Sequence, residues 1–356
     1  MTRAWVEIDL GALRRNGAVM ATRGAALLPM VKADAYGIGA VAAARALETL
    51  SPWGFGVATL EEGRELRDAG VTRPIIVFTP APSDELADLR AARLTPALGT
   101  AQQIEAWRRL GAGREDWHLA IDTGIHRAGV HWDEVDRLRP LLVTAPPQGA
   151  FTHFHSADLD DGSLAEQERR FEHAVAQLPA RPALLHTENS AALARTAMSR
   201  WSLARPGIFL YGVGSGSRAL VQPEHVASLR ARIVEIHMLE DGDTVSYGAT
   251  YRAHGARRIA TLPMGYADGY RRILGNRAQA LVCGRCAPVV GVVTMDMTMV
   301  DVTQAPCEVG DVVTLIGRDG DELRDVASVA RDGDLSPYEM LTGLASRLPR
   351  KYVNAP

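Results

Sequence analysis

The segment LLPMVKADAYGIGA, residues 27–40, introduces the unit from which the first two thirds of this chain are built. An apolar run ends in Lys32, and a polar turn with a tyrosine and glycines follows it. Such runs recur along the chain, and helix-like spacing follows several of them, at 60–70, 101–110 and 163–178. The eight runs are 27–31, 53–58, 74–78, 94–98, 117–121, 149–154, 182–186 and 201–212. Eight strand-plus-helix units predict a parallel (β/α)8 barrel of the TIM type.

The texture changes after about residue 216, where strand-like runs alternate with turns. This pattern predicts a smaller, mostly β C-terminal domain. We therefore expect an α/β protein with a barrel domain over 1–220 and a β domain over 221–356. The length of 356 residues suits two such domains, and 47% hydrophobic with 23% charged residues is typical of a packed globular protein.

The charge pattern favours a small-molecule ligand over nucleic acid or a membrane surface, because the net charge is −3 and the basic residues form no cluster. The N-terminus lacks the apolar stretch of a secretory signal, so we expect a cytoplasmic protein. Three cysteines, an odd number, argue against a disulfide framework. The CGRC segment at 283–286 could be half of a zinc site or a redox pair, but no second CxxC or HxxxH follows it, so we expect no metal.

Polar residues stand at the ends of several predicted strands, where barrel enzymes place their catalytic groups. We expect them to meet at one mouth of the barrel. They are Lys32 after the first strand, Arg127 after the fifth, His153 and His155 on the sixth, His186 and Ser190 after the seventh, and Arg205 with Gly207 at the eighth.

Lys32 suits covalent chemistry with a carbonyl compound. Partial burial lowers the pKa of an amine, so that the uncharged form can attack a carbonyl and form a Schiff base. A lysine at a strand end often only extends its ammonium into solvent, but Tyr36 and Gly37 bring a hydroxyl and exposed backbone beside this one. The segment RPGI, 205–208, adds a cation and a glycine whose backbone a phosphate could approach, although Pro-Gly is usually only a turn.

His153 and His155 support an alternative hypothesis. An HxH pair on a strand points to one side, so with His186 as third ligand it could hold a metal in a barrel hydrolase. Asp158 and Asp122 are poorly placed to complete such a site, and a single histidine is more often a hydrogen-bonded core residue.

Nine motifs spread over nearly the whole chain, and their order is informative. They are VKADAYG (31–37), IDTGIHRAG (121–129), THFHSAD (152–158), HTENS (186–190), RPGIFLYG (205–212), VSYGATY (245–251), GYADGY (265–270), VVTMDMTMVDV (292–302) and SRLPR (346–350). In this order they resemble the motifs of the pyridoxal-phosphate-dependent alanine racemases.

The resemblance implies two opposed bases. Lys32 would carry pyridoxal 5′-phosphate as an imine and exchange the α-proton on one face, with Tyr247 as the base on the other. Stereoinversion needs both, because one base returning its proton to the same face regenerates the starting enantiomer. Tyrosine has a pKa near ~10 and needs help as a base. The resemblance supplies it through His153, hydrogen-bonded between Tyr247 and Arg205, with His186 beyond.

The resemblance also assigns the cofactor contacts. Arg205 would face the pyridine nitrogen, and because a guanidinium does not give up its proton, this nitrogen would stay unprotonated and withdraw fewer electrons, which discourages side reactions. Arg127 would orient the substrate carboxylate. The phosphate contacts would be Tyr36, Ser190, Gly207 and Ile208.

The resemblance further implies an obligate homodimer, in which Tyr247, Tyr266, Met295 and Asp296 reach the barrel mouth of the other subunit and the Met295 backbone N–H lies near the substrate carboxylate. The expected function is interconversion of L- and D-alanine, which supplies D-alanine for peptidoglycan. The closest alternative is a racemase of another small amino acid such as serine, and a more distant one is a non-catalytic cofactor carrier. The carrier would resemble the barrel half only, and the GGG of related decarboxylases is missing here.

Four positions depart from the family pattern. Many members have a carbamylated lysine at the position of Ala120, where it holds the neighbouring arginine, so Arg127 must be held otherwise, by a bound anion or by water. Ile38, Val292 and Ser346 stand where histidine, arginine and tyrosine are common. We expect these changes to alter affinity and rate rather than the reaction.

Overall fold

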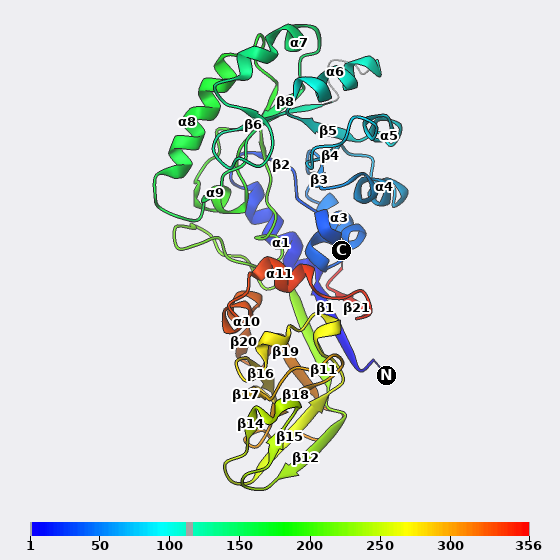
Figure 1. Cartoon of the computed structure of the whole chain (residues 1–356), viewed down its shortest axis with the longest axis vertical. Helices are drawn as coiled ribbons and strands as arrows, with labels where there is room; N and C mark the ends of the chain where they lie inside the picture. Colours follow the sequence, from blue (N-terminus) through cyan, green and yellow to red (C-terminus); the bar gives the residue numbers. More distant parts are fainter. Residues whose placement is uncertain (1, 112–116, 356) are drawn as a thin grey trace.

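The computed structural model describes residues 2–111 and 117–355. Figure 1 shows a barrel at one end of an elongated molecule and a β domain at the other, with α11 (Pro337–Thr342) at their junction. Over these described ranges, no helix combines the length and the apolar character needed to cross a membrane.

The predicted barrel is confirmed. Its strands are buried, which explains why they read as continuous apolar runs rather than as alternating patterns. Hydrogen bonds from Ser202 to Leu185 and from Val31 to Gly56 join the ends of the parallel sheet into a closed ring. The eight strands are β2 (Ala26–Leu27), β3 (Phe55–Val57), β4 (Ile75–Val77), β5 (Thr95–Leu98), β6 (His118–Asp122), β8 (Gly149–Phe151), β9 (Leu184–His186) and β10 (Leu203–Ala204). A short strand, β7 (Val130–His131), pairs with β6 at the mouth.

Helices cover the outside of the barrel (Figure 1). The segments predicted from spacing are α4, α6 and α8, and local capping starts two of them: Thr59 and Glu62 form a capping box at α4, and Thr100 caps α6. The barrel helices are α1 (Leu10–Ala21), α3 (Ala40–Glu48), α4 (Leu60–Asp68), α5 (Leu86–Ala91), α6 (Ala101–Arg109), α7 (Arg139–Thr144), α8 (Ser163–Ala176) and α9 (Ser190–Arg195), with a 3-10 turn at Val135–Leu138.

The predicted mostly β second domain is confirmed as one large, mostly antiparallel sheet. Its strand order is β12-β15-β18-β17-β16-β19-β11-β1-β21, with β20 beside β19. The strands are β1 (Ala4–Asp9), β11 (Ala227–Arg232), β12 (Glu235–Leu239), β15 (Arg257–Leu262), β16 (Gln279–Val282), β17 (Arg285–Val290), β18 (Thr298–Asp301), β19 (Val312–Asp319), β20 (Glu322–Arg324) and β21 (Arg350–Val353). A hairpin of β13 (Thr244–Val245) and β14 (Tyr251–Arg252), the helix α10 (Val326–Asp332) and 3-10 turns at Tyr247–Ala249, Tyr266–Asp268 and Arg272–Leu274 complete it.

The first strand of the chain lies in this second sheet rather than in the barrel. β1 pairs antiparallel with β11 and parallel with β21, so both ends of the chain join the same sheet. The chain therefore crosses between the two halves at each end of the barrel, which ties the halves together through main-chain hydrogen bonds.

Candidate active site

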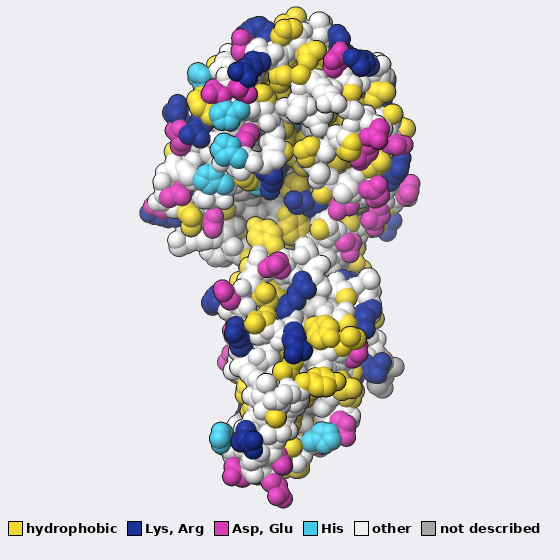
Figure 2. Space-filling view, in the orientation of Figure 1, with side chains coloured by type: hydrophobic (Ala, Val, Ile, Leu, Met, Phe, Trp, Pro, Cys, Tyr) yellow, Lys and Arg dark blue, Asp and Glu magenta, His cyan; other side chains and the backbone are white. Residues whose placement is uncertain are grey.

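A cavity of about 1060 Å³ opens at the carboxyl ends of the barrel strands. Figure 2 shows this mouth as a hollow with hydrophobic and basic side chains inside it. The structure brings nine of the predicted residues together in its lining: Lys32, Tyr36, Arg127, His153, His155, Ser190, Arg205, Gly207 and Ile208. His186, which was also expected at the mouth, is fully buried and does not line the cavity. Asp158 is the one carboxylate of the lining among the described residues. The cavity is therefore suited to an anionic ligand.

Lys32 begins an unusual turn. The four residues after it, 33–36, have φ between 51° and 57°, a left-handed conformation that L residues rarely adopt in succession. Glu62 accepts a hydrogen bond from the Ala33 N–H at 2.7 Å, and the Asp34 carboxylate accepts one from Ala40 at 2.7 Å. These bonds offset the strain. The turn directs the chain away from the strand so that the Lys32 amine enters the cavity, and sequence spacing did not predict it.

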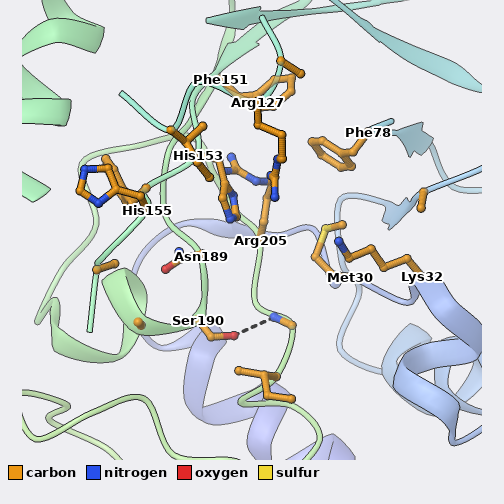
Figure 3. A pocket seen from close by; sticks show the side chains of 18 of the residues that line it. Met30, Lys32, Phe78, Arg127, Phe151, His153, His155, Asn189, Ser190 and Arg205 are labelled. Atoms are coloured by element: carbon orange, nitrogen blue, oxygen red, sulfur yellow. Dashed lines mark hydrogen bonds between the residues drawn. The ribbon is translucent and has the colours of Figure 1, made fainter. Parts of the chain in front are cut away.

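The surroundings of Lys32 favour its uncharged amine. Burial, and then the positive charge of Arg127, lower the pKa of Lys32, while Glu62 opposes the shift. Figure 3 shows Lys32 approaching from one side of the cavity, opposite Arg127, His153 and Arg205. A lowered pKa favours the uncharged form that a nucleophile or a base needs, and the predicted role of Lys32 stays a prediction.

Arg205 lies at the floor of the cavity and is held from below. Its Nη1 donates to His186 Nδ1 at 2.8 Å and to the His186 carbonyl at 2.7 Å. Its Nη2 donates to the carbonyls of Thr152 at 2.6 Å and Thr187 at 3.0 Å. Burial lowers the pKa of Arg205 to about 9, so the guanidinium stays charged at neutral pH.

His153 is a neutral imidazole in this setting. Burial lowers its pKa to about 3, with further lowering by the charges of Arg205, Arg127 and Lys32. His155 was expected to point to the same side of the strand, but β8 ends at Phe151 and the alternation of a strand does not extend to either histidine. His155 is exposed at the rim and bonds Ser156 Oγ at 2.7 Å. Across 2–111 and 117–355 no cluster of three metal-ligating side chains occurs.

Hydroxyl and backbone donors gather at one end of the cavity. The Tyr36 ring stacks on Tyr211 with centroids 4.6 Å apart, and Tyr211 in turn donates to the Met30 carbonyl at 2.7 Å. Ser190 Oγ accepts a hydrogen bond from the Gly207 N–H at 2.8 Å (Figure 3). Burial raises the pKa of Tyr36, so its hydroxyl stays a neutral donor. This end can bind phosphate.

Arg127 is exposed in the cavity and forms no ion pair within the described part of the chain. Its loop is held by Asp122, which accepts hydrogen bonds from the Gly124 and His126 N–H groups at 2.9 and 3.1 Å. Ala120 packs with Phe151 and stands where many family members have a carbamylated lysine. Its methyl group cannot hold Arg127 as that lysine would. The guanidinium is thus free to bind an anion.

The predicted residues of the second domain do not reach this cavity within one chain. Tyr247 is 72% exposed, Met295 53% and Tyr266 38%, which is high for such large apolar side chains. Asp296 accepts a hydrogen bond from Arg347 at 2.6 Å. The roles predicted for these four residues need a second chain and stay predictions.

Sequence reasoning missed Arg347, Tyr338 and His118. Besides Asp296, Arg347 binds Asp268 with two hydrogen bonds, of 2.6 and 3.0 Å. Asp268 belongs to the same turn as Tyr266, so Arg347 connects this turn with Asp296. Tyr338 on α11 lines the cavity from the junction. The only sequence signal for Arg347 was its place in SRLPR, and His118 lies inside a run that looked purely structural.

A lysine amine, several cations and a group of hydroxyl donors in one barrel mouth define a barrel enzyme that binds an anionic carbonyl compound through lysine. Comparison with known proteins identifies the family. Residues 8–215 match the model of the alanine racemase N-terminal domain, and residues 226–352 match that of the alanine racemase C-terminal domain. The chain belongs to the alanine racemase family.

Individual relatives agree over their full length. The alanine racemase of Symbiobacterium thermophilum is 39% identical over 370 residues, which cover 99% of this chain and 97% of that protein. The structure of alanine racemase from E. faecalis has a TM-score of 0.93 at 31% identity, with 99% of this chain and 98% of that one covered. A structure of the Bartonella henselae enzyme with covalently bound pyridoxal phosphate has a TM-score of 0.91 at 27% identity, with 99% and 100% covered. The predicted family is confirmed.

Proposed function

We propose that this protein interconverts L- and D-alanine with pyridoxal 5′-phosphate as its cofactor. The observation that carries the proposal is the convergence of the Lys32 amine, the Arg205 guanidinium and the hydroxyl donors in one cavity. Membership of the alanine racemase family supports it. Supply of D-alanine for peptidoglycan and a cytoplasmic location stay predictions.

The residues of the cavity fit this cofactor. Its aldehyde needs a primary amine, which Lys32 supplies, and its phosphate needs several donors. Tyr36 Oη, Ser190 Oγ and the backbone at Gly207 and Ile208 line one end of the same cavity. A side chain at Gly207 would fill this end, because a Cβ there would lie 2.3 Å from Tyr36 Oη. When bound, the cofactor withdraws electrons from the substrate α-carbon and so makes its proton acidic.

Lys32 holds the cofactor and then moves a proton on one face of the substrate. The lowered pKa favours the uncharged amine, which is the form that accepts a proton. Arg127, opposite it in Figure 3, binds the substrate carboxylate by a charge-assisted hydrogen bond and so orients the α-carbon.

Tyr247 of a second subunit moves the proton on the other face. Its exposure of 72% in one chain leaves the side chain accessible to a partner's cavity. His153, neutral and beside Arg205, can accept a hydrogen bond from the phenol and so assist its loss of a proton. Tyr266 and Met295 enter the same mouth and limit the size of the substrate side chain.

The homodimer is therefore part of the proposal. One chain places the Lys32 amine in the cavity and the Tyr247 phenol outside it. A second copy of the chain is therefore needed to bring both proposed catalytic bases to one site. A two-fold dimer would complete two sites at once, because each subunit would place its Tyr247 in the cavity of the other. We propose a division near residue 220, with β1 and β21 linking the first part to the second.

The test is spectroscopic and kinetic. The purified protein should absorb visible light, and borohydride reduction followed by peptide mapping should find the cofactor on Lys32. Rates should then be measured on both enantiomers of alanine and of serine. Serine is included because a pocket cannot easily exclude one added hydroxyl by packing. If serine is turned over as fast as alanine or faster, alanine is not the preferred substrate. A colourless protein that requires a metal would contradict the proposal altogether.

A further inference from the structure

Arg205 uses almost all of its hydrogen-bonding capacity within the protein. A guanidinium has five N–H groups, all donors. Four of them, on Nη1 and Nη2, are bound to three main-chain carbonyls and to the His186 ring. The Nε–H has no protein acceptor among the described residues, and Arg205 lines the cavity. The orientation of the guanidinium thus decides which N–H it presents to a ligand.

His186 is bound on its other side by a second buried histidine. His186 Nε2 lies 2.8 Å from His118 Nδ1, and His118 Nε2 lies 3.3 Å from Gln148 Oε1. Both imidazoles are completely buried. The side chains of Arg205, His186, His118 and Gln148 therefore form one continuous chain of hydrogen bonds under the floor of the cavity.

Gly149 makes the contact between the two histidines possible. The histidines lie on β6 and β9, with β8 between them, and Gly149 is the β8 residue paired with His118. A Cβ at Gly149 would lie 2.4 Å from His118 Nδ1 and 2.5 Å from its Cε1. The imidazole of His118 occupies this space to reach across β8.

The chain has only one possible direction. Arginine can only donate, so His186 Nδ1 must accept, and a neutral His186 then carries its proton on Nε2. That proton is donated to His118 Nδ1, which leaves the His118 proton on Nε2 for Gln148 Oε1. A proton added to either ring would place two donors face to face. Burial lowers the pKa of His118 to about 4 and that of His186 well below its usual range, in agreement with two neutral rings.

We propose that His118 and Gln148 are positioning residues for Arg205: their hydrogen bonds fix the Nε2–H end of the His186 imidazole, and the fixed ring holds the guanidinium in the orientation that presents Nε–H to the cofactor. The carbonyls of residues 152, 186 and 187 limit the guanidinium's position, and the imidazole sets the direction of Nη1. The kinetic part of the proposal rests on the proposed function, and the tautomers do not.

A purely structural role makes a different prediction. If the two histidines only fill the core, a change near them would lower stability without a selective effect on turnover. A positioning role requires the Nε2–H tautomer in both rings and couples Gln148, at the far end of the chain, to kcat.

The first experiment uses the cofactor-free full chain labelled with 15N-histidine. Nitrogen NMR at neutral pH should show two imidazoles in the Nε2–H form whose N–H protons exchange slowly with water. The His118 signal should move or exchange rapidly in Gln148→Leu, which removes the last acceptor, and in Gly149→Ala, which displaces the ring. Detection of a charged imidazole or an Nδ1–H tautomer at either position would overturn the proposal, whatever the enzyme's activity.

The second experiment measures steady-state kinetics of the holoenzyme at mildly alkaline pH. Gln148→Leu and Gly149→Ala should each lower kcat about tenfold with little change in KM. Gln148→Glu keeps an acceptor and should recover most of the loss. Gly17→Ala is a matched control in α1, on the outside of the barrel and away from the four hydrogen-bonded side chains. Its new Cβ would lie 2.6 Å from Leu50 Cδ1, so this variant should lose stability without a change in kcat.

The outcomes separate the two questions. If the tautomers are as expected but the unsubstituted holoenzyme does not racemise alanine, the proposed function is wrong and the hydrogen-bond chain stands. Unchanged kcat in Gln148→Leu, which lies partly exposed before β8 and should fold, would show that Arg205 needs no such support. In that case the positioning proposal is wrong.

Discussion

Replacing Gly207 by alanine should disturb the phosphate end of the cavity in a way that can be calculated from the structure. The new Cβ would lie 2.3 Å from Tyr36 Oη and 3.1 Å from its Cζ, both closer than atoms can approach without displacement. Tyr36 cannot move freely, because its ring is 7% exposed and stacks on Tyr211. Overpacking of this kind costs about 1–3 kcal/mol, so the free energy of unfolding of the apoprotein should fall by that amount.

The same change should weaken cofactor binding. A displaced Tyr36 hydroxyl loses its hydrogen bond to the phosphate, and a hydrogen bond to a charged group contributes about 1.5–3 kcal/mol. The dissociation constant for pyridoxal phosphate should therefore rise by about 10-fold to about 150-fold. Titration of the apoprotein, followed by absorbance, measures this constant, and urea unfolding of the apoprotein measures the stability.

A double variant separates the two effects. Tyr36→Phe removes the crowded oxygen, so adding it to Gly207→Ala should restore most of the lost stability without restoring cofactor affinity. Tyr36→Phe alone should weaken binding at nearly unchanged stability. The reasoning is refuted if Gly207→Ala is as stable as the parent protein, or if the double variant is no more stable than Gly207→Ala.

Four further predictions follow from the site. Lys32→Ala should give a folded protein without cofactor absorbance and without racemisation, as measured by spectroscopy and an alanine assay. Tyr247→Phe should keep the absorbance and lose most activity, and full turnover would contradict its assignment. Arg347→Lys should raise KM at unchanged absorbance, because an ammonium cannot hold both carboxylates that the guanidinium binds; an unchanged KM would argue against this clamp. Acid should destabilise the fold between about pH 6.5 and about pH 4, because His118 and His186 have lowered pKa values when folded and the unfolded chain binds more protons. Each contributes about 1.4 kcal/mol per pH unit in that window, and urea midpoints that do not fall with pH would contradict this.

The barrel could be predicted because its signal is local. Most residues of the barrel strands are buried and apolar, and Lys32, Arg127 and Arg205 follow such runs, so a parallel barrel brings them together. The left-handed turn at 33–36 could not be predicted, because nothing in the Ala33–Tyr36 residues themselves favours it and its partners, such as Glu62, come from elsewhere. For the same reason the place of β1 in the second sheet was not evident, since its partner strand β11 lies more than two hundred residues away in the chain.

Residue order alone was enough to predict the two-part architecture, the family and most of the residues that line the barrel mouth, because hydrophobic spacing and short motifs are properties of neighbouring residues. Folding decided which polar groups support that set. His118 and His186 are 68 residues apart and meet only because parallel-strand register places Gly149 between them, and Arg347 meets Asp268 across 79 residues. Hydrogen bonds between distant residues depend on strand register and on small gaps in the packing, and the spacing of neighbouring residues does not show which distant side chains these bring together.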